Sequence, residues 1–186
     1  MSDVLLEAAL KHLGASLASG GIDLAHYRRE LAALLQREFG CSRVGLWQIV
    51  GEDGQRTMRC LAKHEEGSGY SPGGEEIREH EYQSYFSHLV AAGVYVSSDT
   101  WNDPVLASMR EVYLVPADTR SMMDAAFTLN GRTFGAVCCE QVGRRREWTT
   151  AEATRLKRCA ALITLHTARH GRADAAAWWD IAAEAA

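Results

Sequence analysis

The chain has 186 residues, of which 47% are hydrophobic and 24% are charged, and its formal net charge is −4 at pH 7. This length suits one domain with additional helices that buries most of its surface without disulfides, and the composition excludes a disordered protein. The negative net charge argues against nucleic acid as a partner, because phosphate binding needs a basic surface.

The cysteines and the N-terminus indicate a cytoplasmic protein. Five cysteines, an odd number without the close pairs of a zinc site, fit reduced thiols better than disulfides. The first apolar pattern carries Asp3, Glu7 and Lys11, which argues against a signal peptide and a membrane span. We therefore predict no bound metal and no membrane partner.

Two amphipathic helices are predicted at the start of the chain. The first has an apolar stripe of Leu6, Leu10, Leu13 and Leu17 and ends at the breaker of residues 19–21. Its stripe must bury against this domain or against a second copy of the chain. The second has a stripe of Leu24, Tyr27, Leu31, Leu34 and Phe39 and is closed by Gly40.

A β-hairpin follows, with strands Arg43–Val50 and Arg56–His64 joined by the turn at residues 51–54. We expect Val44 and Leu46 to face a helical layer and Trp47 to face the other side of the sheet. The next stretch, Glu65–Gly74, is too rich in glycine for regular structure to be expected.

The middle of the chain alternates short helices with a strand. Residues Glu79–Ala92 are predicted to form a helix with the stripe Tyr82, Tyr85, Phe86 and Leu89, followed by a short strand at Val94–Val96. Asp103-Pro104 resembles the N-cap and first position of another helix. Its predicted inward residues are Val105, Leu106, Met109, Val112 and Tyr113.

The strongest local signal is Asn130-Gly131, which supplies the two positive φ angles of a type I′ hairpin turn. It predicts antiparallel strands at Ser121–Leu129 and Arg132–Gln141, with residues equidistant from the turn lying opposite one another. One face then carries Met123, Ala125, Phe127, Phe134, Ala136 and Cys138. The other face carries Met122, Asp124, Ala126, Gly135, Val137, Cys139 and Gln141, and its carboxylate and glycine suit a cavity wall.

The C-terminal part is predicted to be helical. Thr149 and Glu152 form a capping box, so a helix should begin near Thr150. The alanine-rich tail carries Trp178 and Trp179, which we expect to pack on the N-terminal helix or across a dimer interface.

The motifs D-T-W-N-D-P-V-L, R-S-M-M-D-A-A-F, N-G-R-T-F-G-A-V-C-C-E-Q-V-G and R-E-W-T-T-A-E make the chain resemble the GAF domain of bacterial sensor proteins over Asp23–His170. The resemblance implies an α+β fold with a central antiparallel sheet of five to six strands, helices on one face, and a pocket under short helices and loops on the other. We accordingly divide the chain into an N-terminal helix (1–22), a GAF domain (23–170) and a helical tail (171–186).

The pocket that the resemblance implies is predicted to bind a small, flat or partly apolar ligand. Asp124 either pairs with a basic ligand group or caps a loop amide. No nucleophile elbow, H-E-x-x-H motif or Cys-His dipeptide of the bilin-binding members is present, so we predict no catalytic residue, metal ligand or cofactor. The candidate ligand-binding residues are Trp47, Tyr82, Tyr85, Phe86, Tyr95, Trp101, Met109, Tyr113, Asp124 and Cys139.

Three functions remain open from the sequence. The first is a non-catalytic sensor of a small molecule that acts in signal transduction as a homodimer through its terminal helices, read by an effector domain or partner protein. The second is a dimerising interaction module with a filled pocket. The third is a thiol-dependent reductase of free methionine sulfoxide, which GAF domains include, with Cys60 and Cys139 meeting in the cavity.

Overall fold

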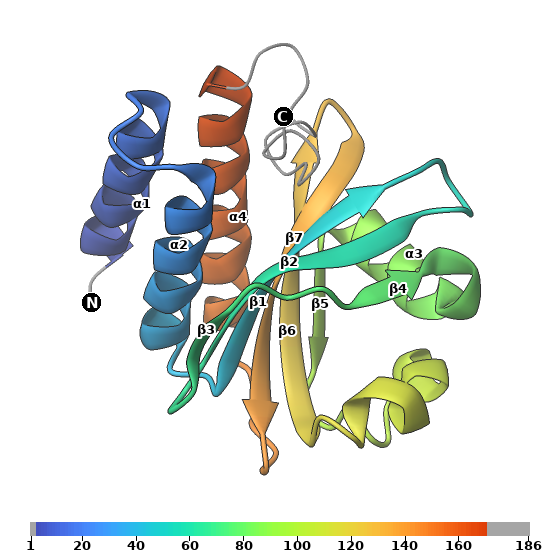
Figure 1. Ribbon diagram of the computed structural model, residues 1–186. Helices are drawn as coiled ribbons and strands as arrows, with labels where there is room; N and C mark the ends of the chain where they lie inside the picture. Colours follow the sequence, from blue (N-terminus) through green and yellow to red (C-terminus); the bar gives the residue numbers. More distant parts are fainter. Residues whose placement is uncertain (1–2, 171–186) are drawn as a thin grey trace.

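The structure, a computed structural model, describes residues 3–170 (Figure 1). Trp178, Trp179 and the rest of the predicted tail lie outside these residues. The helices are α1 (Asp3–Ala18), α2 (Leu24–Phe39), α3 (Gln83–Ala92) and α4 (Thr150–His170), with the short helices η1 (Glu79–Glu81), η2 (Pro104–Met109) and η3 (Arg110–Leu114). The strands are β1 (Arg43–Val50), β2 (Thr57–Glu65), β3 (Gly69–Ser71), β4 (Glu76–Arg78), β5 (Val94–Ser97), β6 (Thr119–Leu129) and β7 (Arg132–Val142).

The strands form one antiparallel sheet in the order β3-β2-β1-β7-β6-β5, with β4 also paired to β2. Helices α1, α2 and α4 cover one face, and α3 with the short helices covers the other (Figure 1). The predicted α+β fold is therefore confirmed. The sheet has seven strands because the stretch expected to be irregular, Glu65–Gly74, contains β3, which pairs with β2 through Lys63 and Ser71.

Each face of the sheet has its own hydrophobic core. We call the core under the three long helices the helix-side core; it includes Val44 and Leu46, as predicted. The other, which we call the pocket-side core, includes Trp47, also as predicted. Its remaining buried members are Ile49, Met58, Cys60, Ile77, Tyr85, Phe86, Leu89, Tyr95, Leu106, Met109, Leu114, Met122, Ala136 and Cys138.

Local capping signals fix the ends of the long helices. The Asp23 carboxylate accepts a hydrogen bond from the His26 amide at 2.7 Å, and Gly40 ends α2 in the left-handed conformation. The capping box of α4 is confirmed, since the Glu152 amide donates to Thr149 Oγ1 at 3.1 Å. Helix α1 buries its stripe within the helix-side core, so it packs on its own domain.

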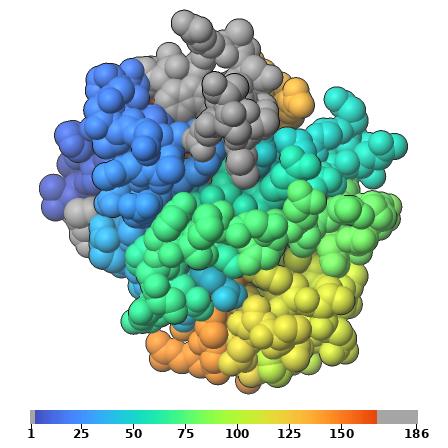
Figure 2. Space-filling model, viewed as in Figure 1, coloured from blue at the N-terminus to red at the C-terminus, as the bar shows by residue number. Residues whose placement is uncertain are grey.

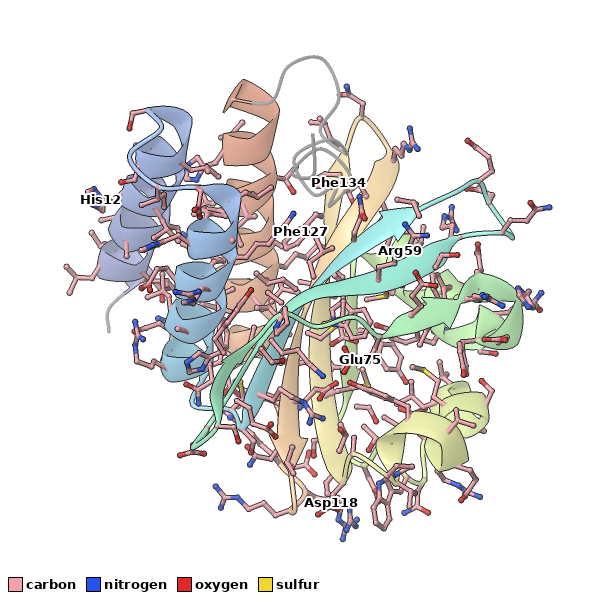
Figure 3. All side chains as sticks on the ribbon, viewed as in Figure 1. His12, Arg59, Glu75, Asp118, Phe127 and Phe134 are labelled. Atoms are coloured by element: carbon pink, nitrogen blue, oxygen red, sulfur yellow. The ribbon has the colours of Figure 1, made fainter. Side chains whose placement is uncertain are left out.

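A β-bulge in β7 corrects the predicted pairing of the main hairpin. Thr128 pairs with Thr133 as expected, but Phe127 pairs with Gly135, which leaves Phe134 as the extra residue. Phe127 and Phe134 both enter the helix-side core, with ring centroids 6.0 Å apart (Figure 3). Because one extra residue reverses the alternation, every later side chain of β7 lies on the face opposite to the predicted one.

As a consequence, the side chains of β7 after the bulge lie in the opposite core from the one predicted. Ala136 and Cys138, predicted to face the helices, lie in the pocket-side core. Val137 and Cys139, predicted to line the cavity, lie in the helix-side core. On β6 the prediction holds: Met122 faces the pocket side, and Met123 and Ala125 face the helices.

The segment after Asp103 differs from a regular helix. Asp103 caps it as predicted by accepting from the Val105 amide at 2.9 Å, but η2 is a 3-10 helix and η3 is a π-helical turn. The Val115 amide donates to the Arg110 carbonyl at 2.8 Å, and this wider turn rotates the side chains that follow. Val112, predicted to face inward, is therefore 63% exposed, while Leu114 is buried.

The close packing at the bulge predicts that adding a methyl group at Gly135 destabilises the fold. A Cβ at Gly135 would lie 2.5 Å from the Trp47 carbonyl oxygen and 2.9 Å from the Phe127 ring, and the strand backbone leaves little room for relaxation. We expect Gly135→Ala to lower the free energy of unfolding by about 3 kcal/mol in urea denaturation. Gly54→Ala, where a Cβ meets nothing within 4 Å and only the positive φ is strained, should lose about 1 kcal/mol. Equal losses would contradict the described bulge.

Candidate ligand pocket

The pocket-side core encloses a small cavity. Its volume of about 10 Å³ is room for about one water molecule. The segment before α3 and the short helices after β5 lie next to each other on the face seen in Figure 2. The cavity is therefore too small in this structure for an organic ligand. The cavity is lined by Trp47, Met58, Ile77, Tyr85, Met109, Tyr113, Met122, Cys138 and Glu140.

The structure brings most of the predicted ligand-binding residues together on one face. Four of them, Trp47, Tyr85, Met109 and Tyr113, line the cavity. The other aromatic candidates do not line the cavity: Phe86 and Tyr95 belong to the pocket-side core, and the partly buried Tyr82 and Trp101 pack against it. Asp124 lies one layer behind the wall, where it contacts Tyr85 and Cys138.

Cys139 is the one candidate that the structure places on the wrong face. The β7 bulge turns it into the helix-side core and puts Cys138 at the cavity wall instead. Cys60 remains on the pocket side, so the two thiols assigned to a reductase lie on opposite faces of the sheet. Burial also raises the pKa of Cys60 to about 12 and that of Cys139 well above its usual value, which disfavours the thiolate that such chemistry needs.

Asp124 is a fully buried carboxyl group. Its Oδ2 accepts a hydrogen bond from the Tyr85 hydroxyl of α3 at 2.7 Å, so it pairs with this tyrosine and does not cap a loop amide. Its Oδ1 makes no hydrogen bond to any described residue. Burial raises the pKa of Asp124 to about 7, although the Tyr85 hydroxyl and the nearby Cys138 thiol act in the opposite direction.

A second polar atom on this face also has no partner among the described residues. Trp47 is only 4% exposed, and its Nε1 donates no hydrogen bond there. The indole lies across Gly45, where a Cβ would come within 2.6 Å of Nε1. A glycine at this position of β1 thus leaves room for the Trp47 indole on the cavity wall.

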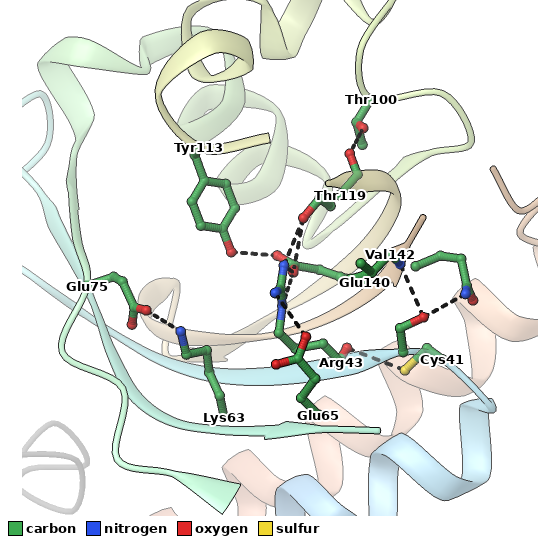
Figure 4. A network of polar contacts seen from close by, with 12 residues as sticks. Cys41, Arg43, Lys63, Glu65, Glu75, Thr100, Tyr113, Thr119, Glu140 and Val142 are labelled. Atoms are coloured by element: carbon green, nitrogen blue, oxygen red, sulfur yellow. Dashed lines mark hydrogen bonds and ion pairs between the residues drawn. The ribbon is translucent and has the colours of Figure 1, made fainter. Parts of the chain in front are cut away.

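The charged residue on the cavity wall, Glu140, belongs to a buried network that sequence reasoning missed (Figure 4). Its Oε2 accepts from Arg43 Nε at 2.6 Å, and its Oε1 accepts from the Tyr113 hydroxyl at 2.8 Å. Arg43 Nη2 also donates to Thr119 Oγ1 at 2.8 Å. Glu140 therefore has its charge compensated and both oxygens bound, which a buried carboxylate requires.

This network attaches the covering segment to the sheet. We call residues 103–114, which contain η2 and η3, the lid. The Tyr95 hydroxyl of β5 donates to Asp103 Oδ2 at 2.7 Å, which anchors the start of the lid. The Tyr113 hydroxyl anchors its end on Glu140. Two tyrosine hydroxyls thus hold the lid closed over the cavity.

A family model for the GAF domain matches residues 23–166. The chain belongs to the GAF domain family. No curated protein sequence matches it. No helix within residues 3–170 combines the length and the apolar character needed to cross a bilayer.

Solved structures with the same fold include GAF domains and a chromophore-binding domain. The phycocyanobilin-bound GAF domain of a cyanobacterial phytochrome has a TM-score of 0.67 at 16% identity and covers 92% of this chain and 99% of its own. The blue-light absorbing PixJ GAF domain of Thermosynechococcus elongatus has a TM-score of 0.63 at 16% identity, with coverages of 79% and 89%. The chromophore-binding domain of bacteriophytochrome RpBphP3 from R. palustris has 0.67 at 12% identity, with coverages of 90% and 62%.

The raised pKa of Asp124 makes the stability of this GAF domain depend on pH. An acid whose pKa is higher in the folded protein than the usual 3.8 stabilises the fold below that value, and the contribution is lost as pH rises through about 7. We expect wild type to lose roughly 2 kcal/mol more unfolding free energy than Asp124→Asn between about pH 5 and pH 8. Urea denaturation of both proteins at each pH measures this difference. Parallel pH profiles would show that Asp124 has an ordinary pKa.

Removal of the Tyr113 hydroxyl should loosen the lid of the GAF domain. Tyr113→Phe leaves Glu140 Oε1 without its partner, at a cost of roughly 1 to 3 kcal/mol. Hydrogen exchange followed by mass spectrometry should show at least about tenfold faster exchange in residues 104–115 and no change in α4. The matched control is Tyr82→Phe, because the Tyr82 hydroxyl makes no hydrogen bond to another described residue and its loss should leave lid exchange unchanged.

Proposed function

We propose that this GAF domain is a regulatory sensor that binds a small molecule between the sheet and the lid, without catalysis, and acts as a homodimer. The observation that carries the proposal is the fully buried carboxyl group of Asp124, which lies directly behind the wall residues Tyr85 and Cys138 of an aromatic-lined cavity and has no ion-pair partner among the described residues. A binding pocket of this kind combines apolar walls with a few polar groups that orient the ligand.

The unused polar atoms favour a ligand over a core that serves stability alone. A buried polar group without a hydrogen bond costs about 1 to 3 kcal/mol. Asp124 Oδ1 and Trp47 Nε1, both on the pocket side, are buried polar atoms of this kind, without a hydrogen-bond partner among the described residues. Apolar residues at these two positions would avoid the cost, whereas a ligand with a donor and an acceptor would offset it.

Ligand binding would require the lid to move. The closed cavity holds no molecule larger than water, so a ligand must displace Tyr113, Met109 or their neighbours. The hydrogen bond between Tyr113 and Glu140 then becomes the interaction that the ligand competes with. A ligand that binds only the open arrangement shifts the population towards it, and this change of lid position is the signal.

The comparisons support a small-molecule sensor in general terms. Similar structures are described as binding a bilin or a chromophore. At sequence identities of 12% to 16%, the similarity supports a shared fold but not a shared ligand. The chain has no Cys-His dipeptide. All five of its cysteines are buried, so we propose a ligand that is not attached covalently.

A dimer through the terminal helices is the proposed means of output. Val4 on α1 is 76% exposed and Leu165 on α4 is 41% exposed, and these two helices pack side by side. A second subunit that covers these side chains would remove apolar surface from water. A change in lid position could then be read by a partner protein or by an effector domain joined to the sensor.

The second candidate function is a dimerising interaction module with a filled pocket. The observation that favours it is the cavity volume of about 10 Å³, since large side chains already occupy the space. In that case the buried polar atoms on the pocket side would have no ligand to bind.

Native mass spectrometry of the protein purified from cells distinguishes these functions. The sensor proposal predicts a dimer that carries a reproducible excess mass, which disappears when the protein is denatured. Val4→Asp should give a monomer, because a charge replaces an exposed apolar residue of α1, and this variant should keep the excess mass. A dimer without any adduct would favour the interaction module, and a wild-type monomer would contradict the proposed assembly.

A further inference from the structure

The wall of the cavity itself carries an acidic side chain but no basic one among the described residues. The only charged residue on its wall is Glu140, and no described Lys, Arg or His lines it. Asp124 stands directly behind the wall residues Tyr85 and Cys138. An anionic ligand in this space would therefore find no basic side chain on the wall to pair with.

The two acids differ in what already binds them. Glu140 is compensated by Arg43, with Nη2 and Oε2 2.5 Å apart, and it also accepts from Tyr113. No ion pair involving a described residue compensates Asp124, and apart from the weak donor thiol of Cys138 no described group is placed to donate to its buried Oδ1. Asp124 is thus the group on this side that would gain most from a positively charged partner.

The remaining wall is suited to a flat cation. Trp47, Tyr85 and Tyr113 present aromatic rings, whose faces attract positive charge. The sulfur-containing side chains of Met58, Met109 and Met122 are flexible and adapt their shape to a flat body.

We propose that the ligand of this pocket is a flat, nitrogen-containing cation, such as an aromatic amidine or a protonated heteroaromatic amine, whose charged nitrogen donates to Asp124 Oδ1. The inference rests on the proposed function, because it names the chemical class of the molecule that the sensor binds. Anions and uncharged molecules of the same shape should bind more weakly than the cation, since only a cation compensates the charge of Asp124.

Cation binding should depend on pH, because it requires Asp124 as a carboxylate. The groups facing Asp124 are Tyr85 from α3, Tyr95 from β5, and Cys138 and Glu140 from β7. Burial raises the pKa values of Tyr85, Tyr95 and Cys138, so these three stay uncharged in the neutral range. Affinity for a cation should therefore rise by up to about tenfold per pH unit between about pH 5 and pH 7.

The test uses probes that share one shape and differ in charge: the amidine, amide and carboxylate forms of benzene and of naphthalene. Dissociation constants are measured by NMR titration of the full chain at about pH 7.5. The amidines should bind at least about tenfold more tightly than the matching amides and carboxylates. Asp124→Asn should remove this preference and the pH dependence while the protein remains folded.

The control variant makes the same chemical change at a buried carboxylate outside the cavity. Glu79 is 6% exposed and pairs with Arg56 at 2.9 Å, and Glu79→Gln should retain the preference for amidines. Amides or carboxylates that bind as tightly as amidines, or a preference that survives in Asp124→Asn, would overturn the cation assignment and leave the sensor function standing. If probes of all three charges fail to bind, the proposed function fails together with the assignment.

Discussion

The arrangement of this domain depends on one extra residue in β7. The bulge at Phe134 determines which side chains of the strand meet the helices and which meet the cavity. With it, Cys138 and Glu140 line the cavity, where Glu140 can bind Tyr113 of the lid. Without it, the same strand would turn both towards the helices, and a carboxylate would lie in the helix-side core.

The bulge also contributes to the difference in composition between the two faces of the sheet. The helix-side core is built from aliphatic and aromatic side chains under three capped helices. The pocket side carries the buried acids Asp124 and Glu140 and a covering segment of 3-10 and π geometry. Tight packing on one face can stabilise the domain while the other face contains groups that lower its stability. Ligand-binding sites are commonly found on faces that contain such groups.

The closed lid follows from a balance between a few polar contacts and the contacts that a ligand would supply. Tyr95 and Tyr113 hold its two ends through partly buried hydrogen bonds. Each such bond to a charged group contributes about 1.5 to 3 kcal/mol. This is small enough for a ligand of micromolar affinity to outweigh, so the closed form is compatible with a sensor that opens.

The parts of the fold that could be predicted from the sequence are those with short-range causes. The Asn130-Gly131 turn, the Thr149 capping box and the apolar stripes of the helices need only neighbouring residues, and the structure confirms them. The bulge could not be predicted in this way, because it depends on the contact of Gly135 with the Trp47 carbonyl of another strand.

The same reason limited the prediction of the site. The aromatic candidates were found because apolar periodicity marks one face of an element, and Asp124 because a carboxylate interrupts an apolar strand. Arg43 and Glu140 were missed because they lie 97 residues apart and meet only in the folded sheet. Cys139 was predicted on the wrong face because no sequence pattern within β7 indicates the bulge.

The most direct test of this account is a ¹³C NMR titration of the Asp124 side-chain carboxyl group, with and without an aromatic amidine. We predict a pKa of about 7 in the free protein and a clear decrease when the amidine is bound, since a cation favours the carboxylate. A pKa near the ordinary value of an aspartate, unchanged by the amidine, would contradict the claim that this domain holds a buried, uncompensated carboxyl group beneath its lid.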